Sequence, residues 1–159
     1  MVILDRIEQW IDQLNEKYSE QRVSCNELSK YFKGFYKKSF LKKAYFVVVD
    51  RIPKPDFPEL RQMGLGGFID MNVGGITYKD TYYIKQEFAQ DLRLHFHELV
   101  HVAQWKHLGA AGFIERYISE INKYGYDNAP LEIMACSCDS HFASNGEKFD
   151  VPRHVKVKI

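Results

Sequence analysis

One stretch of the chain is predicted to form a helix that is apolar on nearly every side, and this limits how the chain can fold. It runs from about Ala89 to Leu108, and Gly109 is placed to end it. A helix that is apolar all round has to be covered by other parts of the chain, so we expect it to be buried. The same stretch contains HELVH, residues 97–101, whose histidines need partners if they are buried. The apolar residues around HELVH are Leu94, Phe96, Leu99, Val100, Val102, Ala103 and Trp105.

Length and composition predict one soluble globular domain. The 159 residues suit a single domain over 1–159, with a core of about 45–145 and an N-terminal helical part, 1–44. The 22 basic and 21 acidic residues nearly cancel, so net charge does not favour a nucleic-acid partner. Three cysteines do not resemble a disulfide framework. No apolar run approaches the about 20 residues of a membrane span, and the N-terminus lacks a signal-peptide pattern, so we expect a cytoplasmic protein without a membrane segment.

The pattern along the chain predicts an α+β fold. Apolar spacing indicates an amphipathic helix over 2–19, and Ser24 followed by Glu27 resembles a capping box that opens a helix to about Phe32. YFVVVD reads as a strand and GGITYKDTYYIKQ as two short strands that turn near Lys79 and Asp80. The other expected segments are a loop over 53–58, helices over 112–123 and from 130 to near 146, and a tail over 147–159 that is either one short strand or irregular.

HELVH has the spacing of a metal-binding and catalytic motif. On a helix His97 and His101 lie one turn apart on the same face, so both can bind one ion. Glu98 is rotated by about 100° from His97, where its carboxylate reaches an activated water without being a ligand. The expected ion is one Zn²⁺, although other divalent metals bind similar ligand sets. The alternative is a motif that arose by chance in a buried helix, with histidines that only hydrogen-bond.

Glu132 is the candidate third ligand. It falls in the first turn of the helix that begins near Pro130, and the intervening helix over 112–123 reverses the chain direction. Two histidines and one carboxylate with one open position form a hydrolytic zinc arrangement. The alternative for Glu132 alone is a glutamate that stabilises a helix N-terminus through the helix dipole.

HELVHVAQW and NAPLEIMA together resemble the gluzincin branch of the zincin metallopeptidases, and more narrowly small, mostly uncharacterised zincin-like domains. The similarity covers Tyr45 to Phe142. It implies a small twisted sheet packed on an active-site helix and on a following helix that bears the glutamate. It also implies that His97, His101 and Glu132 bind zinc and that Glu98 is the catalytic acid and base.

Two positions depart from the pattern of this family. Members often carry an acidic residue where this chain has Met134, and larger gluzincins have an aspartate where this chain has Cys136. Asp139, one turn further along the same face, is the candidate to hold one histidine from behind. In zincins an edge strand binds the substrate backbone, and GGITYKDTYYI is the candidate here.

Hydroxyl groups of that strand region are candidates for stabilising an oxyanion. Tyr78 and Tyr82 are the candidate donors, and cross-strand packing is the preferred reading for both.

The sequence therefore predicts a zinc-dependent hydrolase, a metallopeptidase acting on a peptide or protein. The alternative is a catalytically inactive zincin-like domain, or a metal-stabilised domain that binds other proteins. Five lysines in KGFYKKSFLKK, 33–43, are read as a solvated face over an aromatic core rather than as a nucleic-acid site. Cys136 and Cys138 are read as small core residues rather than as a second metal site.

Overall fold

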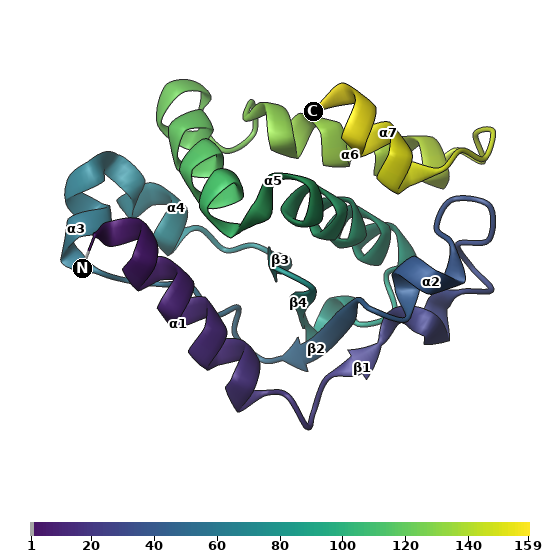
Figure 1. Cartoon of the computed structure of the whole chain (residues 1–159), viewed down its shortest axis with the longest axis horizontal. Coiled ribbons are helices and arrows are strands. Elements are labelled where there is room, and N and C mark those ends of the chain that lie inside the picture. Colours follow the sequence, from purple (N-terminus) through teal and green to yellow (C-terminus); the bar gives the residue numbers. More distant parts are fainter. Residues whose placement is uncertain (1) are drawn as a thin grey trace.

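The chain folds into an α+β structure in which α5 (Leu92–Tyr124) lies between a small sheet and a pair of helices, α6 and α7 (Figure 1). The computed structural model describes residues 2–159. The predicted α+β class is confirmed at this coarse level. The remaining elements are α1 (Ile3–Lys17), β1 (Val23–Ser24), η1 (Cys25–Leu28), α2 (Lys38–Leu41), β2 (Tyr45–Val49), α3 (Pro58–Leu60), η2 (Arg61–Leu65), α4 (Gly66–Asp70), β3 (Gly75–Tyr78), β4 (Thr81–Lys85), η3 (Gln86–Phe88), α6 (Pro130–Ala143) and α7 (Val151–Lys158).

The four strands form one mixed sheet in the order β1-β2-β4-β3. β2 runs parallel to β4, while β1 and β3 pair antiparallel with their neighbours. The β3–β4 hairpin turns at Lys79, whose φ of 62° lies in the left-handed region, and Asp80. The hairpin was predicted from the sequence. It leaves β3 as an edge strand beside α5.

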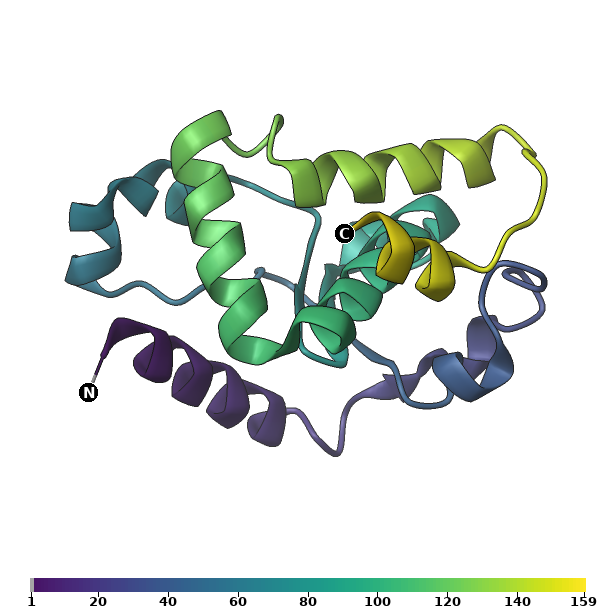
Figure 2. The same cartoon turned by 45° about the horizontal axis from the view of Figure 1, so that its top comes forward.

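The burial predicted for the HELVH helix is confirmed. Every residue from His95 to Trp105 is buried, with the sheet on one side and α6 and α7 on the other (Figure 1). At Gly109, where φ is 74° and ψ is 168°, the helix bends sharply, and it continues to Tyr124 in a new direction (Figure 2). The predicted stop at Gly109 is thus a break between two helical parts. The bend turns the second part of α5 back toward the first.

The helix predicted from Ser24 to Phe32 is wrong. Only the 3₁₀ turn η1 forms there, and the Ser24 hydroxyl accepts a hydrogen bond from the Asn26 amide rather than closing a capping box with Glu27. Ser24 itself pairs with Tyr45 in the sheet, which holds its backbone extended. Strand pairing therefore overrides the local helix signal.

The tail predicted as a strand or as irregular backbone is also wrong, since it forms the helix α7. Asp150 caps it by accepting a hydrogen bond from the Arg153 amide, and Pro152 lies in its first turn. Val151 and Val155 are fully buried against the rest of the core. The signal was present in the sequence DVPR, a capping residue followed by a proline at a helix start.

The helical segment α3–η2–α4 was not predicted from the sequence. It follows the expected proline loop and folds back at Gly64, whose φ is 90°. The ion pairs of Arg61 with Asp56 and Asp70 connect its two ends. This segment lies beside the second part of α5 and the N-terminal half of α1 (Figure 2).

The lysines of 33–43 are exposed, while Phe32, Phe35 and Tyr36 beneath them are buried, as expected for a solvated face over an aromatic core. Among residues 2–159, no helix combines the length and apolarity that crossing a bilayer requires.

Candidate metal centre

Three predicted ligands converge on one point. His97 Nε2 lies 3.1 Å from Glu132 Oε1, His101 Nε2 lies 3.1 Å from Glu132 Oε2, and the two Nε2 atoms are 3.2 Å apart. Ligand atoms about 2.0–2.1 Å from a tetrahedral zinc ion are about 3.3 Å from one another. All three residues are buried, with exposures of 8%, 4% and 4%. The donor set therefore fits a zinc ion in both chemistry and spacing.

The outer nitrogens of both imidazoles are held by acceptors. His97 Nδ1 lies 2.7 Å from Asp139 Oδ2, and His101 Nδ1 lies 2.7 Å from Gln104 Oε1. The Gln104 amide is oriented by its own donation to the Leu131 carbonyl at 3.0 Å. Because a carboxylate and a carbonyl oxygen can only accept, both Nδ1 atoms carry the proton. When the rings are neutral, they present their Nε2 lone pairs to the same point, as metal ligands do.

Asp139 occupies the position that the sequence suggested for it. Its carboxylate bridges His97 and Arg93, whose Nε donates to Oδ1 at 2.6 Å. The side chain is 8% exposed, so its hold on His97 is shielded from solvent. Asp139 thus fixes the orientation of the His97 ring.

The metal-free cluster is also an ion-pair network. Burial lowers the pKa of His97, but hydrogen bonds to Asp139, Cys136 and Glu132 outweigh it, so its pKa lies well above the ordinary value. For His101 burial is likewise outweighed, by the charge and hydrogen bond of Glu132, and the pKa is raised. Burial raises the pKa of Glu132, but the charges and hydrogen bonds of His101 and His97 lower it by more. The pKa of this carboxyl therefore lies well below its usual range. Protons and a metal cation therefore compete for the same atoms, the two Nε2 nitrogens and the Glu132 carboxylate.

Glu98 lies beside the ligands without joining them. Its carboxylate Oε1 accepts a hydrogen bond of 2.8 Å from the Thr77 hydroxyl on β3. Burial raises the pKa of Glu98, and the positive charges of His97 and His101 oppose that shift. A side chain placed at Gly75 would have its Cβ 3.3 Å from this carboxyl, so the glycine keeps the β3 backbone against Glu98. A buried carboxylate of raised pKa is a suitable proton acceptor.

Neither candidate tyrosine has a free hydroxyl at the candidate centre. The Tyr78 hydroxyl donates to the Pro53 carbonyl at 2.7 Å. Tyr82 is fully buried on the face of the sheet that meets α5, and its hydroxyl contacts His95 Nδ1 and Cys25 Sγ instead of the metal centre. Both side chains have structural roles, as the preferred reading held.

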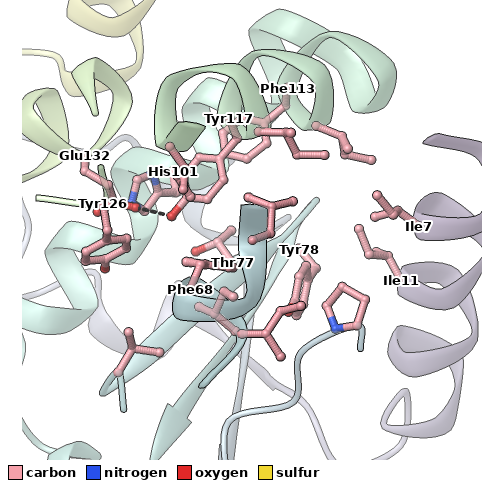
Figure 3. A pocket seen from close by; sticks show the side chains of 18 of the residues that line it. Ile7, Ile11, Phe68, Thr77, Tyr78, His101, Phe113, Tyr117, Tyr126 and Glu132 are labelled. Carbon is pink, nitrogen blue, oxygen red and sulfur yellow. Dashed lines mark hydrogen bonds and ion pairs between the residues drawn. The ribbon is translucent and has the colours of Figure 1, made fainter. Parts of the chain in front are cut away.

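Two tyrosines that the sequence did not single out lie at the candidate centre instead. The Tyr117 hydroxyl donates to Glu132 Oε2 at 2.7 Å, and Tyr126 lies at the same end, near Glu132 (Figure 3). Phe68 of α4 packs against both rings. Tyr117 reaches Glu132 only because α5 bends at Gly109, and no sequence pattern specifies the direction of that bend.

A pocket opens beside the candidate centre. Figure 3 shows His101, Glu132, Tyr117 and Tyr126 at one end and Ile7 and Ile11 of α1 at the other. Its cavity volume is about 90 Å³. Glu98 and Thr77 are also part of its wall. The ligands, the candidate base and an apolar cavity therefore share one space.

The edge of β3 presents free main-chain groups in this region. Residues of an antiparallel pair alternate between facing the partner strand and facing away from it. The Gly74 carbonyl accepts a hydrogen bond from the Lys85 amide at 2.9 Å, so Gly74 faces β4. The main-chain groups of Gly75 and Thr77 accordingly point toward the open edge.

The cysteines differ from each other in environment. Cys138 is buried in the core as expected, whereas Cys136 is exposed and the expectation for it is wrong. Cys136 lies beside His97 and Asp139. Its Sγ, one ring nitrogen of His97 and one carboxylate oxygen of Asp139 all lie within 4.8 Å of one another. Cys136 lies one turn after Glu132 on α6.

Comparison of the chain with models of known protein families, with curated proteins and with solved structures finds no match.

Proposed function

We propose that this protein is a zinc-dependent hydrolase of the zincin type, a metallopeptidase whose substrate is a peptide or protein. The observation that carries the proposal is the convergence of His97 Nε2, His101 Nε2 and a Glu132 oxygen, with both Nδ1 atoms engaged from behind. A buried ion-pair cluster needs no such orientation of both rings. A His₂Glu metal site does.

Zinc, when bound, supplies Lewis acidity that polarises a carbonyl and makes water more acidic. The role of Glu98 is to accept the proton of the attacking water and to return it to the leaving amine. Thr77 orients the Glu98 carboxylate by donating to Oε1, and Asp139 and Gln104 hold the histidines in place. The free main-chain groups of Gly75 and Thr77 pair with the backbone of an extended substrate.

Tyr126 is our candidate for donating a hydrogen bond to the developing oxyanion, since the Tyr117 hydroxyl already donates to Glu132. Tyr126→Phe is expected to lower kcat by about 10²–10³-fold, the usual effect of losing one such donor, with no change in zinc content. Steady-state kinetics on a cleaved peptide measures this. Tyr124→Phe, at an exposed position two residues earlier, is the matched control and should retain wild-type kcat. Equal kcat values for Tyr126→Phe and wild type would remove Tyr126 from the mechanism.

Elemental analysis of the untagged protein tests the metal site. We expect about one zinc per chain in wild type and its loss in Glu132→Gln, because the amide keeps the shape of the side chain but not the charge of the ligand. Glu120→Gln is the matched control, since Glu120 is a buried carboxylate that caps Leu131 and does not face the histidines. Zinc retained in Glu132→Gln would remove the third ligand. A wild-type protein that takes up no zinc would contradict the proposed function.

One observation favours the second candidate, a catalytically inactive domain that binds other proteins. The two histidines and Glu132 already neutralise one another without a metal. In that case the side chains of HELVH stabilise the fold as an ion-pair cluster. The protein then takes up no zinc in the elemental analysis, where the hydrolase proposal expects about one zinc per chain.

A further inference from the structure

We propose that the cavity beside Glu98 is a specificity pocket for one branched aliphatic side chain of the substrate, of about the size of valine, leucine or isoleucine. The side chain belongs to a residue that adjoins the bond being cleaved. This inference rests on the proposed function, and it adds the class of substrate.

The pocket is continuous with the candidate metal centre. Glu98, His101 and Glu132 are part of its wall, so a group that enters it lies within reach of the reacting atoms. From there the cavity extends toward Ile7 and Ile11, which form its far end (Figure 3). A substrate with its scissile carbonyl at the metal centre can therefore place a neighbouring side chain in the cavity.

The far end selects against charged and polar side chains. Away from the metal centre the wall is apolar, and it offers no partner for an ammonium, a guanidinium or a carboxylate. A charge moved there would lose its hydration without compensation. The residues that form this part of the wall are Ile7, Ile11, Leu60, Leu65, Ile69, Phe113, Ile114 and Ile118.

The volume selects against large rings. A cavity of about 150 Å³ is known to accommodate benzene in a protein interior. The cavity here is about 90 Å³, so it suits a branched aliphatic group rather than a phenyl or indole ring. Ile7 and Ile11 on α1, together with α3–η2–α4, close the space that a larger side chain would need.

Trp105 contributes the apolar surface of its ring to the pocket wall. Its side chain is part of the wall and the residue is 5% exposed. Its indole Nε1–H is buried and has no hydrogen-bond acceptor among residues 2–159. The Nε1 atom is closed off from the cavity as well as from bulk solvent, so a group that enters the pocket meets only apolar surface of this side chain.

Binding can be measured separately from turnover. Glu98→Gln protein is titrated by calorimetry with blocked tripeptides, acetyl-Ala-X-Ala-amide, in which X is glycine, alanine, leucine, lysine or tryptophan. We expect the leucine peptide to bind roughly 50-fold more tightly than the alanine peptide, from burial of three more carbons. The lysine and tryptophan peptides should bind no better than the alanine peptide. Equal affinities for leucine and alanine would overturn the inference.

Two variants connect the preference to the pocket. Ile7→Ala enlarges the far end and should shift the preferred residue X from leucine toward an aromatic residue, while Ile3→Ala on the same helix, outside the wall, should not. Ile118→Phe, at a half-buried position, fills the cavity and should reduce the leucine preference at least about tenfold. Exposed Ile133→Phe is its control. An unchanged preference in both pocket variants, each checked for folding by circular dichroism, would overturn the inference.

Hydrolysis of the same tripeptides by the zinc-loaded wild type distinguishes the two proposals. A leucine preference in binding without turnover of any peptide supports the pocket and contradicts the hydrolase. Turnover of all peptides at similar kcat/KM supports the hydrolase and overturns the specificity pocket.

Discussion

Glu98→Gln is expected to lower kcat for peptide hydrolysis by about 10²–10⁴-fold, the usual contribution of a positioned general base, and to leave the zinc content unchanged. The amide retains the size of the side chain, and its oxygen still accepts the hydrogen bond from Thr77. It cannot accept a proton from water. Because Glu98 is not among the converging ligands, the metal should remain bound.

Two measurements together make this test informative. Single-turnover kinetics on a cleaved peptide gives the loss of rate, and elemental analysis of the same preparation gives the metal content. Glu120→Gln is a buried substitution of the same type elsewhere on α5, and it should keep the wild-type rate and the wild-type zinc content. A Glu98→Gln protein with wild-type kcat would show that another group accepts the proton. A loss of zinc would instead make Glu98 part of the metal site.

The candidate metal centre was largely predictable because it depends on local spacing. The i and i+4 relation alone brings His97 and His101 to one face of α5, whatever the rest of the fold. Asp139 shares a helix with Glu132, so its position follows once α6 is placed against α5. These residues need only two helices in contact, which a short connection between them favours.

Which tyrosines lie at the candidate centre could not be predicted, because their positions depend on tertiary geometry. Tyr82 and Tyr83 are adjacent on β4 and point to opposite faces, and the sequence does not say which face meets α5. Tyr117 reaches Glu132 only through the bend at Gly109. A glycine predicts that a helix ends, but not the direction in which the chain continues.

The pocket depends on the segment α3–η2–α4, whose helical turns were not predicted from the sequence. Prolines between 53 and 58 correctly indicated a loop, but the following helical turns have little amphipathic pattern, and α4 has no buried residue. Even so, Leu60 and Leu65 close the cavity together with α1. Local propensity was weak there, and packing against α1 and α5 determines the conformation.

Zinc is expected to stabilise the protein strongly at pH 8 and much less at pH 5.5. In the metal-free protein His97 and His101 have raised pKa values, so their ion pairs contribute stability fully below the ordinary value of 6.5 and lose it as the pH rises through the raised values. Glu132 has a depressed pKa, so its contribution is present above the ordinary value of 4.5 and is lost as the pH falls through the lowered value. This cluster therefore stabilises the metal-free protein most between these two ordinary values.

Zinc requires the deprotonated histidines, so protons compete with it throughout that window. At pH 8 a zinc concentration about 1,000 times the Kd adds about 4 kcal/mol of stability, which corresponds to a rise in Tm of roughly 8–16 °C for a domain of this size. At pH 5.5 the same zinc concentration must displace protons from both rings, and the rise in Tm should be small. Thermal unfolding at the two pH values, with and without zinc, measures the difference.

Glu132→Gln and magnesium are the controls for this experiment. The variant should lose the zinc-dependent rise at pH 8, while Glu120→Gln should keep it. Magnesium should have no effect, since it prefers oxygen ligands to two imidazoles. An equal zinc-induced rise at both pH values would show that zinc binds somewhere other than the two histidines. The pH dependence shows that zinc competes with protons for its ligands, and its loss in Glu132→Gln but not in Glu120→Gln assigns those ligands to this cluster.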